Sequence, residues 1–240
     1  MSSRPILVLQ HIVCEHPGIF RDFLAEDGIA WEPVELDAGE ALPSLEAYAA
    51  LWVMGGPMDV WQEPEYPWLI AEKQLIHEAV ADRGMPFLGL CLGHQLLAEA
   101  LGGTVGPGEP EIGIFPVTRT EASHDSPFLD GFAQSFEALQ WHGAEVKRAP
   151  ASATVLLQSP LCGVQAMSLG RRAFSVQFHV EMTHTTLTEW GDVPAYRSAL
   201  ESTLGPDALT EFNVLTAARL PGFNAAARQL YDNWKAAALI

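Results

Sequence analysis

The stretch PFLGLCLGHQLLAEALGG, Pro86 to Gly103, decides the expected fold of this chain. Its first residues form a short apolar run, which is typical of a buried strand. Gln95 to Leu101 is a run of good helix formers that two glycines close. Between them, residues 89–93 read GLCLG. A strand that turns sharply into a helix, with small residues two before and two after the central one, is typical of a nucleophile elbow.

Cys91 is the candidate nucleophile of this elbow. It precedes a helix, whose dipole favours a thiolate at that end. The backbone N–H of Leu92 is left free to bind an oxyanion. A buried cysteine in an ordinary strand–helix turn is the alternative interpretation of the same residues.

Composition limits the classes of protein to consider. The chain has 240 residues with 48% hydrophobic content, which suffices for one α/β domain and a modest extension. Its formal net charge of −17 argues against nucleic acid and against an anionic membrane surface as partners. We expect no signal peptide and no transmembrane helix. Three widely spaced cysteines without C-x-x-C pairs indicate a reducing compartment, so a cytoplasmic location is expected.

Upstream of the elbow, short apolar runs alternate with helical patterns. This order predicts a doubly wound, mostly parallel sheet of the flavodoxin-like kind, in which sites form at the carboxyl ends of strands. Gly55 and Gly56 follow one expected strand directly, and Cys91 follows another. The expected strands are Pro5 to Leu9, Trp31 to Leu36 and Ala50 to Met54, and the expected helices are Phe20 to Ala25 and Pro67 to Arg83.

Downstream of Thr104 the pattern changes to short strand-like runs, which we interpret as antiparallel additions to the sheet. These runs are Ile112 to Thr120, Ser135 to Gln140, Thr154 to Gln158, Gly163 to Ser168 and Ala173 to His179. From Met182 onward the pattern is helical. We therefore divide the chain into a domain over residues 1–184 and a C-terminal helical extension over residues 185–240. A helix from Pro221 to Ile240 is expected to pack its apolar stripe on the domain.

A cysteine nucleophile needs a base, and the base needs an orienting group. Residues 177–181, QFHVE, supply both. On an extended segment, His179 and Glu181 face the same side, so the carboxylate can fix the imidazole tautomer. A core histidine at the end of a strand is the alternative interpretation. The order nucleophile, base, acid differs from that of α/β-hydrolases, in which the acid precedes the base.

The elbow, extended as G-H-Q, and the H-x-E segment together resemble the motifs of class I (triad-type) glutamine amidotransferases. The resemblance covers Arg4 to Glu181 and departs at Val180, where most members have proline. It implies that Cys91, His179 and Glu181 are the catalytic residues.

The same resemblance implies the remaining site residues. Gly56 and Leu92 would supply the oxyanion N–H groups, with Gly55 as the alternative donor and a substrate contact. Gln95, one helical turn after the nucleophile, would contact the substrate. Residues 141–143 (Trp141, His142 and Gly143) resemble the W-H-G segment of the GMP-synthetase-like branch, which holds the amino-acid end of glutamine. Glu111, in an E-I-G segment of that branch, would lie near the substrate amine.

The activity implied is hydrolysis of the glutamine side-chain amide through a Cys91 thioester, releasing ammonia and glutamate. No synthetase domain is recognisable in the chain, so three alternatives stay open. The chain is a glutaminase subunit that feeds a separate synthetase, a self-sufficient γ-glutamyl peptide or amide hydrolase, or a non-catalytic regulatory member of the fold. We expect no cofactor and no metal, because the histidines outside these segments form no close cluster with cysteines or carboxylates.

Overall fold

The computed structural model describes residues 4–239. The first three residues, which belong to the expected N-terminal domain, and Ile240, the expected end of the last helix, lie outside the described residues. Within residues 4–239, no helix combines the length and the apolarity needed to cross a membrane.

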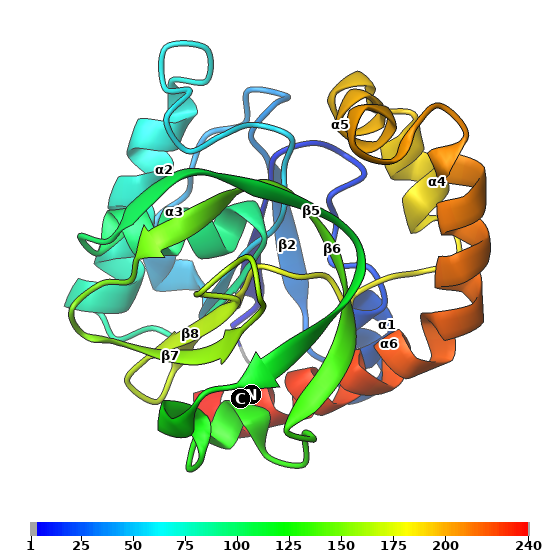
Figure 1. Ribbon diagram of the computed structural model, residues 1–240. Coiled ribbons are helices and arrows are strands. Elements are labelled where there is room, and N and C mark those ends of the chain that lie inside the picture. Colours follow the sequence, from blue (N-terminus) through cyan, green and yellow to red (C-terminus); the bar gives the residue numbers. More distant parts are fainter. Residues whose placement is uncertain (1–3, 240) are drawn as a thin grey trace.

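Within the described part of the chain, nine strands form one mixed sheet in the order β2-β1-β3-β4-β9-β8-β7-β5-β6 (Figure 1). The parallel strands are β2 (Trp31–Glu35), β1 (Ile6–Gln10), β3 (Ala50–Val53), β4 (Phe87–Leu90) and β9 (Ala173–Val176). The antiparallel strands are β8 (Ala166–Leu169), β7 (Ala153–Gln158), β5 (Thr104–Arg119) and β6 (Ser135–Arg148). The central parallel strands are buried along their whole length, as their continuous apolar sequences predict.

Helices cover both faces of the parallel half, which makes the fold doubly wound. On β1, Ile6 and Val8 belong to one hydrophobic cluster and Leu7 and Leu9 to the other, because successive side chains point to opposite faces. The first cluster includes α1 (Phe20–Asp27) and the end of α6 (Ala208–Ala238). The second includes α2 (Trp68–His77), which continues as a π-helical turn over Glu78–Asp82, and α3 (Leu92–Ala100).

The remaining helical elements are α4 (Thr186–Gly191), α5 (Pro194–Leu204) and 3₁₀ turns at Leu45–Ala47, Glu121–Ser123 and Pro127–Leu129. Together α4, α5 and the start of α6 form the helical group at the upper right of Figure 1. A third hydrophobic cluster joins these three helices to β5 and β6.

Three elements are longer than expected. The last helix does not begin at Pro221 but runs through it from Ala208. Proline removes one intrahelical hydrogen bond, but Phe212 and Phe223, on either side of it, are both buried in the third cluster and keep the helix continuous. The expected strands around Ile112 and Ser135 are also too short, because β5 tolerates its Gly- and Pro-rich start through a shift in register between Pro107 and Glu111.

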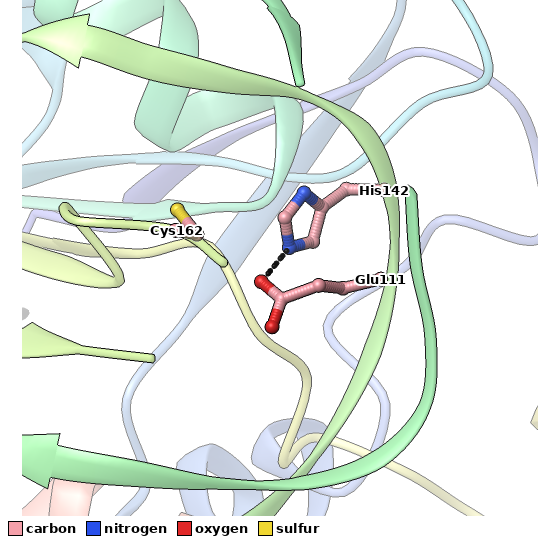
Figure 2. A group of neighbouring side chains, drawn as sticks. All are labelled: Glu111, His142 and Cys162. Atoms are coloured by element: carbon pink, nitrogen blue, oxygen red, sulfur yellow. Dashed lines mark ion pairs between the residues drawn. The ribbon is translucent and has the colours of Figure 1, made fainter. Parts of the chain in front are cut away.

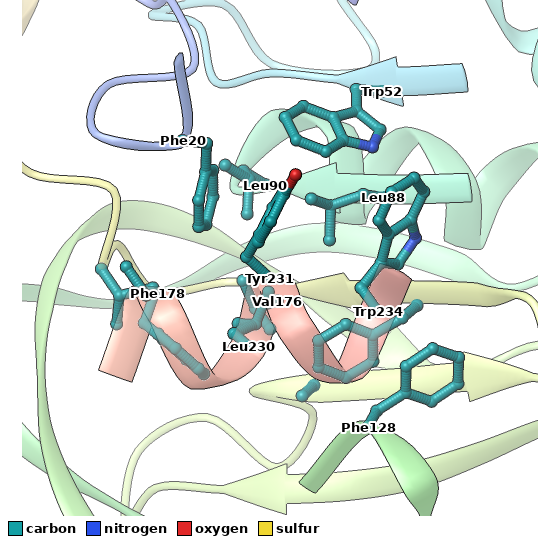
Figure 3. Close-up of a cluster of buried hydrophobic side chains, with 14 of the residues drawn as sticks. Phe20, Trp52, Leu88, Leu90, Phe128, Val176, Phe178, Leu230, Tyr231 and Trp234 are labelled. Atoms are coloured by element: carbon teal, nitrogen blue, oxygen red, sulfur yellow. The ribbon is translucent and has the colours of Figure 1, made fainter. Parts of the chain in front are cut away.

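Helix α6 contributes aromatic side chains to the core beneath the sheet (Figure 3). Trp234 is fully buried, meets Trp52 of β3 edge to face at 5.2 Å, and donates from Nε1 to the Phe87 carbonyl oxygen at 2.9 Å. Tyr231 lies one turn earlier and donates to Asp27 at the end of α1 at 2.7 Å. These contacts support the packing expected of the extension, whose boundary at residue 184 stays a prediction.

We expect Trp234→Ala to lower the free energy of unfolding by about 3–5 kcal/mol, because it opens a cavity and leaves the Phe87 carbonyl without its donor. Urea unfolding followed by circular dichroism measures this loss. Val214→Ala on the exposed face of α6 is the matched control, with an expected change within about 0.5 kcal/mol. Equal effects of the two substitutions would contradict the packing argument.

Candidate active site

Cys91 lies where β4 passes into α3, in a backbone conformation that L-residues rarely adopt. Its φ is 50° and its ψ is −102°, a strain that costs about 1–3 kcal/mol and is typical of a nucleophile elbow. The flanking glycines are needed for close approach. A Cβ at Gly93 would stand 2.1 Å from the Val53 carbonyl oxygen, and one at Gly89 would stand 2.7 Å from the Gly93 oxygen.

His179 links Cys91 to Glu181, and all three residues are buried. The His179 Nδ1 atom is 2.6 Å from Glu181 Oε1, and the backbone N–H of Val180 donates to Oε2 at 2.9 Å. Cys91 lies close enough to the imidazole to act on its pKa. Burial alone lowers the pKa of His179, but the Glu181 charge and the Cys91 sulfur outweigh burial and raise that pKa well above its usual value. The arrangement favours an imidazolium beside the sulfur.

Two backbone N–H groups are free next to the sulfur. Within residues 4–239, neither Gly56 N–H nor Leu92 N–H donates a hydrogen bond. The loop after β3 presses against the elbow, since a Cβ at Gly56 would stand 2.8 Å from Leu92 Cδ2. A Cβ at Gly55 would stand 2.3 Å from Glu15 Oε2. Two N–H groups in this place can hold the oxyanion of a tetrahedral intermediate.

A cavity of about 190 Å³ opens beside Cys91. Most of the site residues expected from the sequence line it: Gly56, Cys91, Leu92, Gln95, Trp141, His142 and Gly143. Gly55, His179 and Glu181 are not among the lining residues. The structure therefore brings the expected substrate contacts to one cavity, except Gly55, whose carbonyl oxygen meets His11 instead.

Gln177 is a site residue that sequence reasoning missed. Its Nε2 donates to Cys91 Sγ at 3.6 Å, and its Oε1 accepts from Gln95 Nε2 at 3.1 Å. Gln95 Nε2 also donates to the Ala144 carbonyl oxygen at 3.1 Å. The signal was present, because Gln177 has the same two-residue spacing to His179 that His179 has to Glu181.

We expect Gln95→Ala to raise KM for glutamine about 2- to 12-fold, the effect of losing one hydrogen bond, with kcat lowered less. Among the described residues, Gln95 Oε1 accepts no hydrogen bond, and this leaves it free for a substrate donor. Steady-state ammonia release measures both constants. Gln74→Ala, at an exposed position of α2, is the control. A fall in kcat with unchanged KM would instead assign Gln95 to orienting Gln177.

The C-terminal extension reaches into the site, which no sequence motif indicated. The Trp190 ring of α4 meets the His179 ring at 4.6 Å between centroids. The Tyr196 hydroxyl of α5 donates to Glu15, a buried carboxylate beside His179. The cavity wall includes Ala195, Tyr196, Ala199, Ser202 and Thr203, all from α5.

Glu111, His142 and Cys162 form a buried cluster with the spacing of a metal-ligand set, and His142 also lines the cavity (Figure 2). His142 Nε2 lies 3.3 Å from Glu111 Oε2, and the same carboxylate accepts hydrogen bonds from Ser159 and Gln165. Burial raises the pKa of the Cys162 thiol to about 12, so the sulfur keeps its proton. The Glu111 carboxylate, held by Ser159 and Gln165, thus lies within ion-pair distance of the His142 ring and supports it.

Comparisons with known proteins agree with this geometry. A family model described as glutamine amidotransferase class-I matches residues 24–190. The glutamine amidotransferase-like protein YfeJ of Salmonella typhimurium is 36% identical over 180 residues, which cover 72% of this chain and 74% of that protein. A subunit of the glutamine-hydrolyzing GMP synthase of Sulfolobus acidocaldarius is 32% identical over 64% of this chain and 78% of its own. The match to the GMP synthase of Aeropyrum pernix, 40% identical, spans only 27% of that protein's length.

Solved structures extend the similarity to the C-terminal helices. A glutamine amidotransferase from Thermotoga maritima superposes with a TM-score of 0.81 at 30% identity and covers 99% of each chain. A glutamine amidotransferase from Methylobacillus flagellatus gives 0.84 at 30% identity, over 98% of this chain and 96% of its own. Because the family model matches most of the sequence and these folds match nearly all of it, the chain belongs to the class I glutamine amidotransferase family.

Proposed function

We propose that this chain hydrolyses the side-chain amide of glutamine through a thioester on Cys91, releasing ammonia and glutamate. The observation that carries the proposal is the buried His179–Glu181 pair, joined at 2.6 Å, next to Cys91 at the wall of a cavity. A thiol activated by an imidazole whose tautomer a carboxylate fixes is suited to acyl transfer.

In the proposed mechanism, the Cys91 sulfur attacks the amide carbon and the carbonyl oxygen becomes an oxyanion. The N–H groups of Gly56 and Leu92 stabilise that oxyanion. His179 gives the proton it took from the thiol to the amide nitrogen, and the C–N bond breaks as ammonia leaves. Water then attacks the thioester and passes a proton to His179, which returns it to the sulfur when glutamate departs.

The second candidate function is a self-sufficient γ-glutamyl hydrolase, and the position of α5 favours it. Five residues of this helix line the cavity, so one wall of the site comes from the chain itself rather than from a partner. A glutaminase that feeds a separate synthetase is the other alternative, supported by relatives named as subunits of glutamine-hydrolyzing GMP synthases. The non-catalytic alternative is disfavoured because Cys91, His179 and Glu181 are all present and His179 is hydrogen bonded to Glu181.

One experiment separates these functions. Purified protein without any partner is given glutamine and γ-glutamyl dipeptides, and the release of ammonia or amine is measured under steady-state conditions. Turnover of glutamine supports the main proposal, and comparable or better turnover of the dipeptides supports the γ-glutamyl hydrolase. No turnover of either, with Cys91 still reactive toward an electrophile, indicates a missing partner. An unreactive Cys91 supports the regulatory alternative. A cytoplasmic location, suggested by three free thiols, stays part of the proposal.

A further inference from the structure

His11 is a fully buried histidine that the mechanism above does not use. It directly follows β1, at the carboxyl end of the sheet where the cavity lies. Its Nδ1 is 2.6 Å from the carbonyl oxygen of Gly55, and its Nε2 is 2.9 Å from Oε1 of Glu72. Glu72 comes from α2 and is also fully buried. The Trp68 ring stacks on the imidazole at 5.5 Å with an interplanar angle of 24°, which holds the ring in this orientation.

The partners decide which imidazole atoms carry protons. A carbonyl oxygen can only accept, so the Nδ1 atom of His11 must donate to Gly55. The other nitrogen faces a carboxylate, which also prefers a donor. Burial alone lowers the pKa of His11, but the charge and hydrogen bond of Glu72, the Gly55 carbonyl and the charge of Glu15 outweigh it and raise that pKa. His11, held in place by Glu72, is therefore a fixed hydrogen-bond donor to the Gly55 carbonyl in the loop after β3.

That carbonyl belongs to the same peptide unit as the Gly56 N–H. Peptide units are planar, and no cis peptide bond occurs in the described part of the chain, so the Gly55 C=O and the Gly56 N–H point in opposite directions. Holding the carbonyl toward His11 therefore turns the Gly56 N–H away from His11. Leu92 of the elbow contacts Gly56 closely, and this N–H has no acceptor among residues 4–239.

We infer that His11 and Glu72 form a clamp on the Gly55–Gly56 peptide. The hydrogen bond from His11 holds the Gly55 carbonyl so that the Gly56 N–H points toward the reacting carbonyl oxygen of the substrate. The two glycines make such a clamp necessary. A Gly-Gly peptide can rotate with little steric resistance, and a rotated peptide would offer an oxygen where the transition state needs a donor. His11 and Glu72 are thus positioning residues, because they act on the substrate through Gly56. The inference rests on the proposed function.

The test removes the hydrogen bond from His11 to the Gly55 carbonyl without leaving the Glu72 charge buried and unpaired. Replacing His11 alone strands the Glu72 carboxylate, so the main variant combines His11→Phe, which keeps a ring against Trp68, with Glu72→Leu. His11→Asn combined with Glu72→Leu is the rescue variant, since its side-chain amide can still donate near the Nδ1 position and no buried carboxylate is left without a partner. Far-UV circular dichroism and thermal unfolding confirm that each variant is folded. Four quantities are then compared with wild type: kcat for glutamine, KM for glutamine, affinity for glutamate γ-semialdehyde, and the rate of Cys91 alkylation by iodoacetamide.

The double variant is expected to lose about 10²- to 10³-fold in kcat, as when one oxyanion donor is removed. The affinity for the aldehyde should fall in parallel, because its thiol adduct also places an oxygen in the oxyanion site. KM and the iodoacetamide rate should stay within about threefold of wild type, since neither depends on that site. The rescue variant, with His11→Asn in place of His11→Phe, should recover at least about tenfold of the lost kcat.

Two results would overturn the clamp while leaving the proposed function intact. One is a folded double variant whose kcat and aldehyde affinity stay within about threefold of wild type. The other is a parallel fall of the iodoacetamide rate and kcat, which would show that His11 acts on Cys91 instead. If wild-type protein turns over no glutamine, the aldehyde affinities of wild type and variant still test the clamp. A wild-type protein that neither turns over glutamine nor binds the aldehyde refutes the proposed function, and the clamp with it.

Discussion

Cys91→Ser is expected to lower kcat for glutamine hydrolysis by about 10⁴-fold or more, the largest single effect in the protein together with loss of the base. A serine hydroxyl in the same elbow is far less nucleophilic than a cysteine sulfur paired with an imidazole base. The other cysteines offer no substitute. Burial raises the pKa values of Cys14 and Cys162 to about 12, so both thiols stay protonated at neutral pH.

A glutamine-mimicking chloroketone provides the direct measurement. Mass spectrometry of the digested protein should find the label on Cys91 and nowhere else, with turnover lost in proportion to labelling. Cys14→Ser is the matched control, because this half-buried thiol is more exposed than Cys91 but has no elbow, and it should retain wild-type labelling and turnover. Label on Cys14 with Cys91 untouched would contradict the assignment of the nucleophile.

The parts of this site that the sequence predicts are those in which chemistry and spacing are local. The G-x-C-x-G pattern needs only a strand, a tight turn and a helix, and the structure has all three within residues 87–100. The spacing of His179 and Glu181 needs only an extended backbone. The fully buried parallel strands were likewise predictable, because each is a continuous apolar run.

The parts that escaped prediction depend on contacts between distant segments. Tyr196 donates to Glu15 across 181 positions, and His11 meets Glu72 across 61. No periodicity in either segment specifies these pairings, because each side chain alone is an ordinary polar residue on a helix or after a strand. The α5 wall of the cavity is also decided by packing, through the third hydrophobic cluster, rather than by a motif.

His179→Ala is expected to lower kcat by about 10⁴-fold or more, whereas Glu181→Gln is expected to cost about 10²- to 10³-fold. In the proposed mechanism His179 touches the reacting atoms, whereas Glu181 acts only through His179. The negative charge of Glu181 stabilises the imidazolium and so raises the pKa of His179. A neutral glutamine removes that charge, and the pKa of His179 falls. The alkaline limb of the kcat profile, where the imidazolium loses its proton, should therefore move to lower pH in Glu181→Gln.

Measurement of kcat against pH for wild type and both variants tests this pair, with Glu137→Gln on the exposed surface as the charge-matched control. The control should leave the alkaline limb in place, because its carboxylate pairs with Arg219 on the surface. The contrary result is a Glu181→Gln protein with wild-type kcat and an unshifted limb. The orienting charge would then have to come from Glu15, the other buried carboxylate that faces His179, and Glu15→Gln should then produce the shift that Glu181→Gln did not.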